Sequence, residues 1–125
     1  MTRKLSAEDT ELLNEPQIAN VASVLADGSP HVTPVWIDTD GEAVLFNTFK
    51  NSVKHRNLLR DPRVAISVVD KADPYRTLVV RGNVEFTEDG ADDHIDKLAK
   101  KYLGMDSYPW RSPEKVRIIA RVVLN

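Results

Sequence analysis

The stretch FNTFKNSVKHRNLLRDPRV, residues 46–64, decides the fold of this chain, because its hydrophobic pattern changes period within a few residues. Residues 42–48 read as a strand, whereas residues 51–60 have the apolar spacing of a short helix. The Asp-Pro pair at 61–62 ends that helix, since the residue before a proline disfavours helical backbone. A nearly continuous apolar run at 64–69 indicates the next strand. The stretch therefore predicts a strand, a short helix and a second strand in immediate succession.

A β-hairpin is expected before this stretch. The pair Asp27-Gly28 is a strong hairpin-turn signal, and it lies between apolar strands expected at 18–25 and 31–37. Pro34 interrupts the second strand, which predicts an edge, a bulge or a place where another group approaches the backbone. A further turn is expected at 38–41.

A short helix is expected at 6–13, ahead of the hairpin. Ser6 is suited to cap its N-terminus, and Asp9 lies three residues on, as in a capping box. Pro16 ends it, because proline cannot continue a helix.

The C-terminal half continues the series of strands with one longer helix. Gly82 lies inside an expected strand, which predicts a bulge or a bend. The charged residues at 92–101 are typical of a solvated helix face, with no functional role. The elements expected here are a strand at 77–86, a helix that starts at 88–92 and runs to about 103, a loop at 105–113 and a strand at 116–124. Six strands joined mostly by hairpins predict a mainly β fold, a closed or nearly closed antiparallel barrel with helices at its ends.

The composition is that of one globular domain, which we expect to span residues 1–125. Hydrophobic residues make up 42% and charged residues 29% of the chain. The formal net charge of −2 predicts no bulk attraction to nucleic acid or to an anionic membrane. Cysteine is absent, which excludes disulfides, thiol chemistry and cysteine-ligated metal sites. Neither a secretory signal nor a membrane-spanning run is found, and we expect a cytoplasmic protein.

The motifs of several enzyme classes are missing from the sequence. It contains no GxGxxG, GxxxxGK[ST] or GxSxG, so dinucleotide-binding, P-loop and serine-hydrolase functions lose their main support. His31, His55 and His94 are far apart and have no second ligand at metal-binding spacing, so no metal site is expected. No pair of residues suggests acid–base catalysis, and we assign no catalytic residue.

Residues 46–63 form a basic segment in a chain of negative net charge. Lys54 and Arg56 fall near the first turn of the expected helix, where cations oppose the helix dipole by a few tenths of a kcal/mol to about 1 kcal/mol. The free backbone N–H groups of that turn, with Asn51 and Ser52, would make a phosphate site. A solvated basic helix face is the alternative. The basic side chains of the segment are Lys50, Lys54, Arg56, Arg60 and Arg63.

The segment resembles the pyridoxamine 5′-phosphate oxidase-like split-barrel superfamily. In that family an aromatic-x-Thr strand end is followed by Ser-x-Lys, a short helix and Asn/Asp-Pro-Arg-Val. This chain has FNT at 46–48, SVK at 52–54 and DPRV at 61–64. The hairpin ADGSPHVTPVW at 26–36 is similar as well, and the resemblance extends over residues 12–123. It implies a six-stranded antiparallel split β-barrel of the FMN-binding type, which forms a homodimer with the cofactor site at the subunit interface.

The resemblance also implies a cofactor bound by its phosphate. The short chain and the PHVTPVW strand at 30–36 are most similar to the actinobacterial and archaeal enzymes that use the deazaflavin coenzyme F-420. FMN is the usual cofactor of the wider family, but many FMN oxidases have arginine just before the phosphate lysine, where this chain has Val53. Lys50 is then the candidate to supply the missing charge. The implied cofactor-binding residues are Lys54 with Thr48, Lys50 and Ser52 at the phosphate, Thr33, Pro34, Val35 and Trp36 along the ring, and Asn47 facing the cofactor.

Several residues outside the basic segment, most of them aromatic, each have two possible roles. Trp36 is either a core residue or a wall of the ligand site. Tyr75 and Arg76 either cap the barrel or reach the partner's cofactor. Tyr108 and Trp110 are either dimer contacts or a lid over the substrate.

Three functions are compatible with this reading. The preferred one is an oxidoreductase that transfers hydride between reduced F-420 and an unsaturated or quinone-like small molecule. The second is an FMN enzyme of the pyridoxamine-phosphate-oxidase or flavin-reductase type, although no added set of basic residues near the C-terminus suggests a second phosphate. The third is a non-enzymatic flavin- or haem-binding barrel.

Overall fold

The computed structural model describes residues 3–125, and it confirms the predicted strand–helix–strand order of the deciding stretch. β3 (Val44–Phe49) leads into α2 (Val53–Arg60), and β4 (Arg63–Val69) follows it. The side chain of Ser52 caps α2 by accepting a hydrogen bond from the backbone N–H of the third helical residue.

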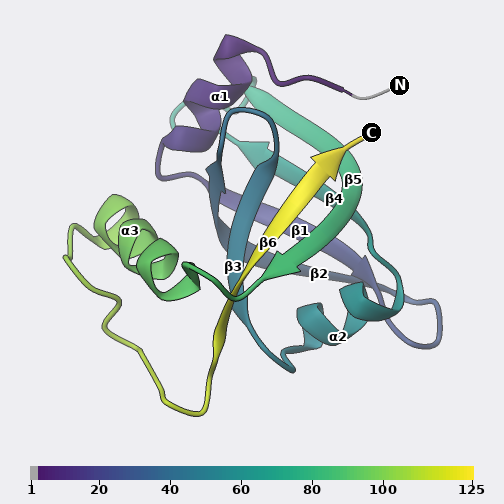
Figure 1. Ribbon diagram of the computed structural model, residues 1–125. Helices are drawn as coiled ribbons and strands as arrows, with labels where there is room; N and C mark the ends of the chain where they lie inside the picture. The colour runs from purple at the N-terminus through teal and green to yellow at the C-terminus, as the bar shows by residue number, and fades with distance from the viewer. Residues whose placement is uncertain (1–2) are drawn as a thin grey trace.

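The strands close into an antiparallel barrel in the order β1-β2-β3-β6-β5-β4 (Figure 1), which confirms the predicted fold class. β1 (Ile18–Val24) and β2 (Pro30–Thr39) form the expected hairpin. β5 (Thr77–Thr87) and β6 (Arg117–Leu124) complete the barrel between β4 and β3.

Three helices surround the barrel. α1 (Ala7–Asn14) and α2 lie at opposite ends of it, and α3 (Ala91–Leu103) lies along its side near β3 (Figure 1). The capping box predicted for Ser6 and Asp9 is present at the start of α1. No helix in the described part of the chain is long and apolar enough to cross a membrane.

The hydrophobic core fills the barrel. Alternate residues of each strand point inward, as the pleat requires, and leucines from α1 and α2 close the two ends. Each fully buried side chain of this size contributes about 1.5–3 kcal/mol relative to an exposed one. The largest fully buried side chains include Phe46, Leu12, Leu13, Ile37, Leu58 and Ile66.

β2 pairs with β3 only near the C-terminal end of β2, and the gap between the two strands elsewhere positions the site. Residues 30–36 of β2 pair with β1, whereas only residues 37–39 pair with β3. Pro34 lies in the separated part, so the edge predicted from this proline is confirmed. Asp38 lies in the paired part, which is why it belongs to a strand and the turn expected at 38–41 begins later than predicted.

Gly82 allows two strands to approach each other closely. A Cβ atom built on Gly82 would lie 2.1 Å from the backbone oxygen of Val123 on β6. Gly82 pairs in regular register with Val64 of β4 and with Leu124 of β6, so the predicted bulge is absent. The bend is present, because β5 curves strongly around the barrel (Figure 1).

Candidate functional site

A pocket of about 370 Å³ opens at the split between β2 and β3. The two strands supply facing walls, because they are not joined by hydrogen bonds at this level. α3 and the loop after it form a third side, and α2 and β6 each contribute one cation. The lining residues are Ile18, Pro34, Val35, Trp36, Asn47, Thr48, Phe49, Lys54, Ile95, Leu98, Tyr108, Trp110 and Arg117.

Two half-buried cations, Lys54 and Arg117, converge on this pocket. Neither forms an ion pair with a carboxylate of residues 3–125. Burial lowers the pKa of the Lys54 ammonium, and the nearby positive charge of Arg117 lowers it further. Burial also lowers the pKa of the Arg117 guanidinium. Because burial disfavours both charges and Arg117 further disfavours the Lys54 ammonium, an anion bound between them would relieve an unfavourable arrangement.

The side chain of Arg117 is held by three contacts. Its Nε donates a hydrogen bond of 2.8 Å to Oδ1 of Asn47. Its guanidinium carbon lies 5.3 Å from the ring centre of Tyr108 and 5.8 Å from that of Phe49, within the range of cation–π attraction. Among the described residues, its two terminal nitrogens have no hydrogen-bond partner, so they are available to a ligand.

Aromatic rings form another part of the pocket wall. Trp36 stacks on Tyr102 with a centroid distance of 5.0 Å and an interplanar angle of 6°. Tyr108 meets Trp36 edge-on at 6.1 Å and Trp110 at 5.7 Å. Trp36 is thus a wall of the pocket that is backed by a packed ring, and the two loop aromatics line the same pocket.

α3 fixes the aromatic loop through Asp96. Its Oδ1 accepts a hydrogen bond of 2.8 Å from the backbone N–H of Tyr108 and one of 2.6 Å from Arg111. The prediction that the charged residues at 92–101 only face solvent is therefore wrong for Asp96, because the loop folds back onto this face of the helix.

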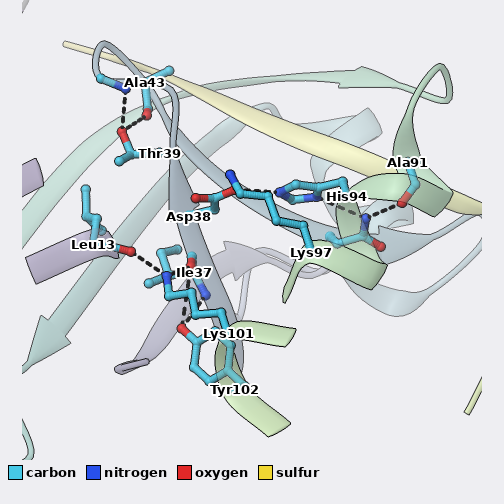
Figure 2. Close-up of polar contacts among 12 residues, drawn as sticks. Leu13, Ile37, Asp38, Thr39, Ala43, Ala91, His94, Lys97, Lys101 and Tyr102 are labelled. Carbon is cyan, nitrogen blue, oxygen red and sulfur yellow. Dashed lines mark hydrogen bonds and ion pairs between the residues drawn. The ribbon is translucent and has the colours of Figure 1, made fainter. Parts of the chain in front are cut away.

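The same prediction is wrong for Lys101. Its half-buried ammonium donates hydrogen bonds of 2.6 Å to the carbonyl oxygens of Leu13 and Ile37 (Figure 2), and it thereby joins α3 to α1 and β2. Burial lowers the pKa of Lys101 to about 8. Sequence spacing gave no sign of this, since the helix face meets elements that lie far away along the chain.

The structure brings six of the nine predicted cofactor-binding residues to the pocket, namely Pro34, Val35, Trp36, Asn47, Thr48 and Lys54. Ser52 lies behind the lining, where its Oγ is 2.9 Å from Oγ1 of Thr48. Lys50 does not line the pocket, and its ammonium pairs with Glu88 at 2.6 Å. Thr33 does not line it either, and its buried Oγ1 has no hydrogen-bond partner in the described part of the chain.

Sequence reasoning missed Arg117. This arginine begins a regular alternating strand, RIIARVVL, and nothing next to it in the sequence marks it as a ligand. The pairing of β6 with β3 places Arg117 directly across from Phe49 and so beside the predicted site. Only barrel closure makes that contact. Residues 3–125 contain no group of three His, Cys, Asp or Glu side chains arranged to hold a metal ion.

The loop between β4 and β5 lies outside the pocket lining. Arg76 pairs with Glu15 at 2.7 Å and with Asp70 at 3.0 Å, which ties this loop to the segment after α1. Tyr75 is 94% exposed. Arg76 therefore has a structural partner of its own, and a contact of Tyr75 with a partner's cofactor stays a prediction.

Known structures resemble this one over nearly its whole length. An F-420 reductase is 34% identical, with 92% of this chain and 91% of that chain covered and a TM-score of 0.82. A conserved hypothetical protein from Mycobacterium tuberculosis is 24% identical, with 99% and 82% covered and a TM-score of 0.73. The HupZ protein of group A Streptococcus is 21% identical, with 97% and 90% covered and a TM-score of 0.68.

Comparison with curated proteins gave no match. The family model for pyridoxamine 5′-phosphate oxidase matches residues 5–125, a range that contains every strand of the barrel and every residue of the pocket. The chain therefore belongs to the pyridoxamine 5′-phosphate oxidase family.

Proposed function

We propose that this chain is an oxidoreductase that binds coenzyme F-420 by its phosphate and transfers hydride between the reduced coenzyme and an unsaturated or quinone-like small molecule. One observation carries the proposal: Lys54 and Arg117 lie half-buried in one pocket without acidic partners. The similarity to an F-420 reductase over nine-tenths of the chain supports it. We further propose that residues 1–125 form a single cofactor-binding domain, whose site is completed at the subunit interface.

The residues of the pocket fit a cofactor that has an anionic tail and a planar ring. A phosphate group offers acceptor oxygens, and Lys54 and Arg117 offer charged donors from two different elements. The aromatic wall of Trp36 and Tyr108 suits a flat ring, because offset and edge contacts between rings are favourable. Ile95 and Leu98 of α3 add an apolar surface that keeps water from this side.

In such an enzyme the bound deazaflavin or flavin ring supplies the hydride chemistry. The protein's own residues bind, orient and shield. Lys54 and Arg117 would hold the phosphate, and the stack of Trp36 on Tyr102 would give the pocket a rigid wall. The proton that accompanies hydride in such a reduction would come from water at the open pocket, so our proposal assigns no catalytic residue.

Side-by-side titration of the purified protein with F-420 and FMN, followed by cofactor fluorescence, tests this function. We expect micromolar binding of F-420 and weaker binding of FMN. A preference for FMN would assign the protein to the FMN-dependent members of the family. Absence of binding by both cofactors would overturn the proposal and leave the two cations without a role.

Whether a coloured cofactor copurifies with the protein distinguishes a non-enzymatic flavin- or haem-binding protein from an F-420 enzyme. A carrier or sensor binds its flavin or haem tightly and is expected to purify coloured, whereas an F-420 enzyme is expected to purify empty and bind from solution. An absorption spectrum of the freshly purified protein makes this distinction before any substrate is tested.

We also propose that the protein forms a homodimer that completes the pocket. The outer surface of the sheet formed by β2, β1, β4 and β5 carries exposed apolar side chains, namely Ile18, Val32, Val69 and Val79, at exposures of 47–63%. Ile18 belongs both to this surface and to the pocket lining, so the pocket opens toward it. An apolar sheet face next to an open site is suited to a second copy of the chain.

Substitution of Val32 by glutamate tests the dimer. Val32 is 60% exposed, so the monomer tolerates the charge, but an apolar interface would have to bury it. We expect Val32→Glu to shift the protein from dimer to monomer in sedimentation at micromolar concentration and to weaken cofactor binding with it. A wild-type protein that sediments as a monomer while binding cofactor would contradict the proposal.

A further inference from the structure

A chain of hydrogen bonds, buried at its Asp38–His94 end, leads from β2 through α3 to Arg117 in the pocket. Nε2 of His94 lies 3.0 Å from Oδ2 of Asp38, and both side chains are buried, at 8% and 3% exposure (Figure 2). Nδ1 of His94 lies 3.1 Å from Nδ2 of Asn47, and Oδ1 of Asn47 accepts the 2.8 Å bond from Nε of Arg117. The chain thus connects a residue in the paired part of β2 with the guanidinium in the pocket.

The hydrogen bonds of Asn47 determine its orientation. Nδ2 of Asn47 donates to the carbonyl oxygen of Ala91 at 3.0 Å as well as to His94. Rotation of the amide by half a turn would set its oxygen against that carbonyl and its nitrogen against the N–H of Arg117. Because Nδ2 of Asn47 is the donor, Nδ1 of His94 must be the acceptor. Nε2 of His94 then carries the hydrogen and donates a hydrogen bond to Asp38.

Asp38 is suited to anchor the chain because it stays ionised. Burial acts to raise its pKa, but hydrogen bonds from His94, the backbone of Thr39 and Lys97 lower the pKa to about 2. Lys97 reaches the same Oδ2 atom from the exposed side at 3.1 Å (Figure 2). The carboxylate therefore fixes the imidazole in one tautomer, and the imidazole fixes the amide.

We infer that His94 is a positioning residue of the pocket, which through Asn47 holds the Arg117 guanidinium so that its two terminal nitrogens bind a phosphate together. This inference rests on the proposed function. Arginine has a long side chain, and ordering it on binding costs rotamer entropy. Because Nε is already bonded to Asn47, the side chain is partly ordered before a ligand binds, and its two terminal nitrogens remain available in the pocket.

The test separates phosphate contact from general damage by comparing FMN with riboflavin, which lacks the phosphate. The ratio of their dissociation constants reports the phosphate contact alone. We expect Arg117→Met to reduce the preference for FMN about 10-fold or more. We expect His94→Leu to reduce it about 3- to 10-fold in the wild-type background but less than about 2-fold in the Arg117→Met background. His94→Asn, which keeps an acceptor at the Nδ1 position, should restore most of the preference.

Two controls make the result decisive. Lys100→Ala changes an exposed residue of the same helix and should leave the ratio unchanged. The N–H resonance of Arg117 Nε, assigned by its loss in Arg117→Met, should exchange slowly with water in the wild type and rapidly in His94→Leu. This second measurement needs no cofactor.

The outcomes distinguish the inference from the function on which it rests. If His94→Leu weakens FMN and riboflavin equally, or if the Nε proton stays protected in it, the positioning role is wrong. If the wild type binds neither FMN nor F-420, the proposed function is wrong, and the Nε exchange rate still decides whether His94 orders Arg117.

Discussion

Gly82→Ala is expected to unfold this protein or to lower its Tm by more than about 10 °C. The new Cβ would lie 2.1 Å from the backbone oxygen of Val123 and 3.0 Å from a methyl carbon of Val122. The oxygen belongs to the ladder between β5 and β6, so it cannot move without breaking the pairing that closes the barrel. Overpacking of a core costs about 1–3 kcal/mol and more where backbone must shift. For a domain of this size each kcal/mol corresponds to about 4 °C.

Gly28→Ala is the matched control for that experiment. Gly28 has a φ of +88°, and a Cβ added there meets no atom within 4 Å. The substitution therefore costs only the strain of a left-handed backbone, about 1–2 kcal/mol. Thermal unfolding followed by circular dichroism should rank the two variants clearly. Equal losses of stability would mean that the close approach of β5 and β6 is not what requires glycine at position 82.

Lys54→Ala is expected to weaken cofactor binding by about 1–3 kcal/mol, roughly 5- to 150-fold, without a matching loss of stability. Lys54 is one of two cations in the pocket, and its side chain has no acidic partner among residues 3–125 that would be left unpaired. Removal of the ammonium should even relieve repulsion with Arg117 in the empty protein. Fluorescence titration with F-420 and FMN measures the effect, and Tm checks the fold.

Two further variants sharpen the result for Lys54. Arg56→Ala removes an exposed cation from the same helix and should change affinity little, because general charge attraction is screened by salt. Lys54→Arg keeps the charge at alkaline pH. The pKa of Lys54 is lowered in the free pocket and raised by a bound anion, so wild-type affinity should fall as the pH rises through the free-pocket pKa. That fall should be absent in Lys54→Arg. Unchanged affinity in Lys54→Ala would overturn the phosphate-site assignment.

Local signals predicted most of the elements. Asp27-Gly28 marked the hairpin, and Ser6 marked the start of the first helix, because a turn or a cap involves only residues a few positions apart. The alternation of apolar residues predicted the strands for the same reason. Errors of boundary arose where a partner strand decided the length, as for the end of β2 at Thr39.

The site was predicted in part, through residues that follow one another in the sequence. Lys54 and Asn47 lie in or beside the basic segment and reach the pocket. Lys50 lies in the same segment but pairs with Glu88, and a left-handed turn at Asn51, where φ is +68°, separates it from the helix that carries Lys54. Charge and proximity along the chain could not distinguish these two lysines.

The sequence by itself determined a six-stranded antiparallel barrel with a basic turn between its third strand and its second helix, since period, caps and turn residues act over short distances. Tertiary structure alone decided which side chains share the pocket. Arg117 meets Asn47, and Asp38 meets His94, only when the barrel closes and α3 packs against it. Such contacts depend on strand register and helix placement, which are properties of the whole packed core rather than of any segment.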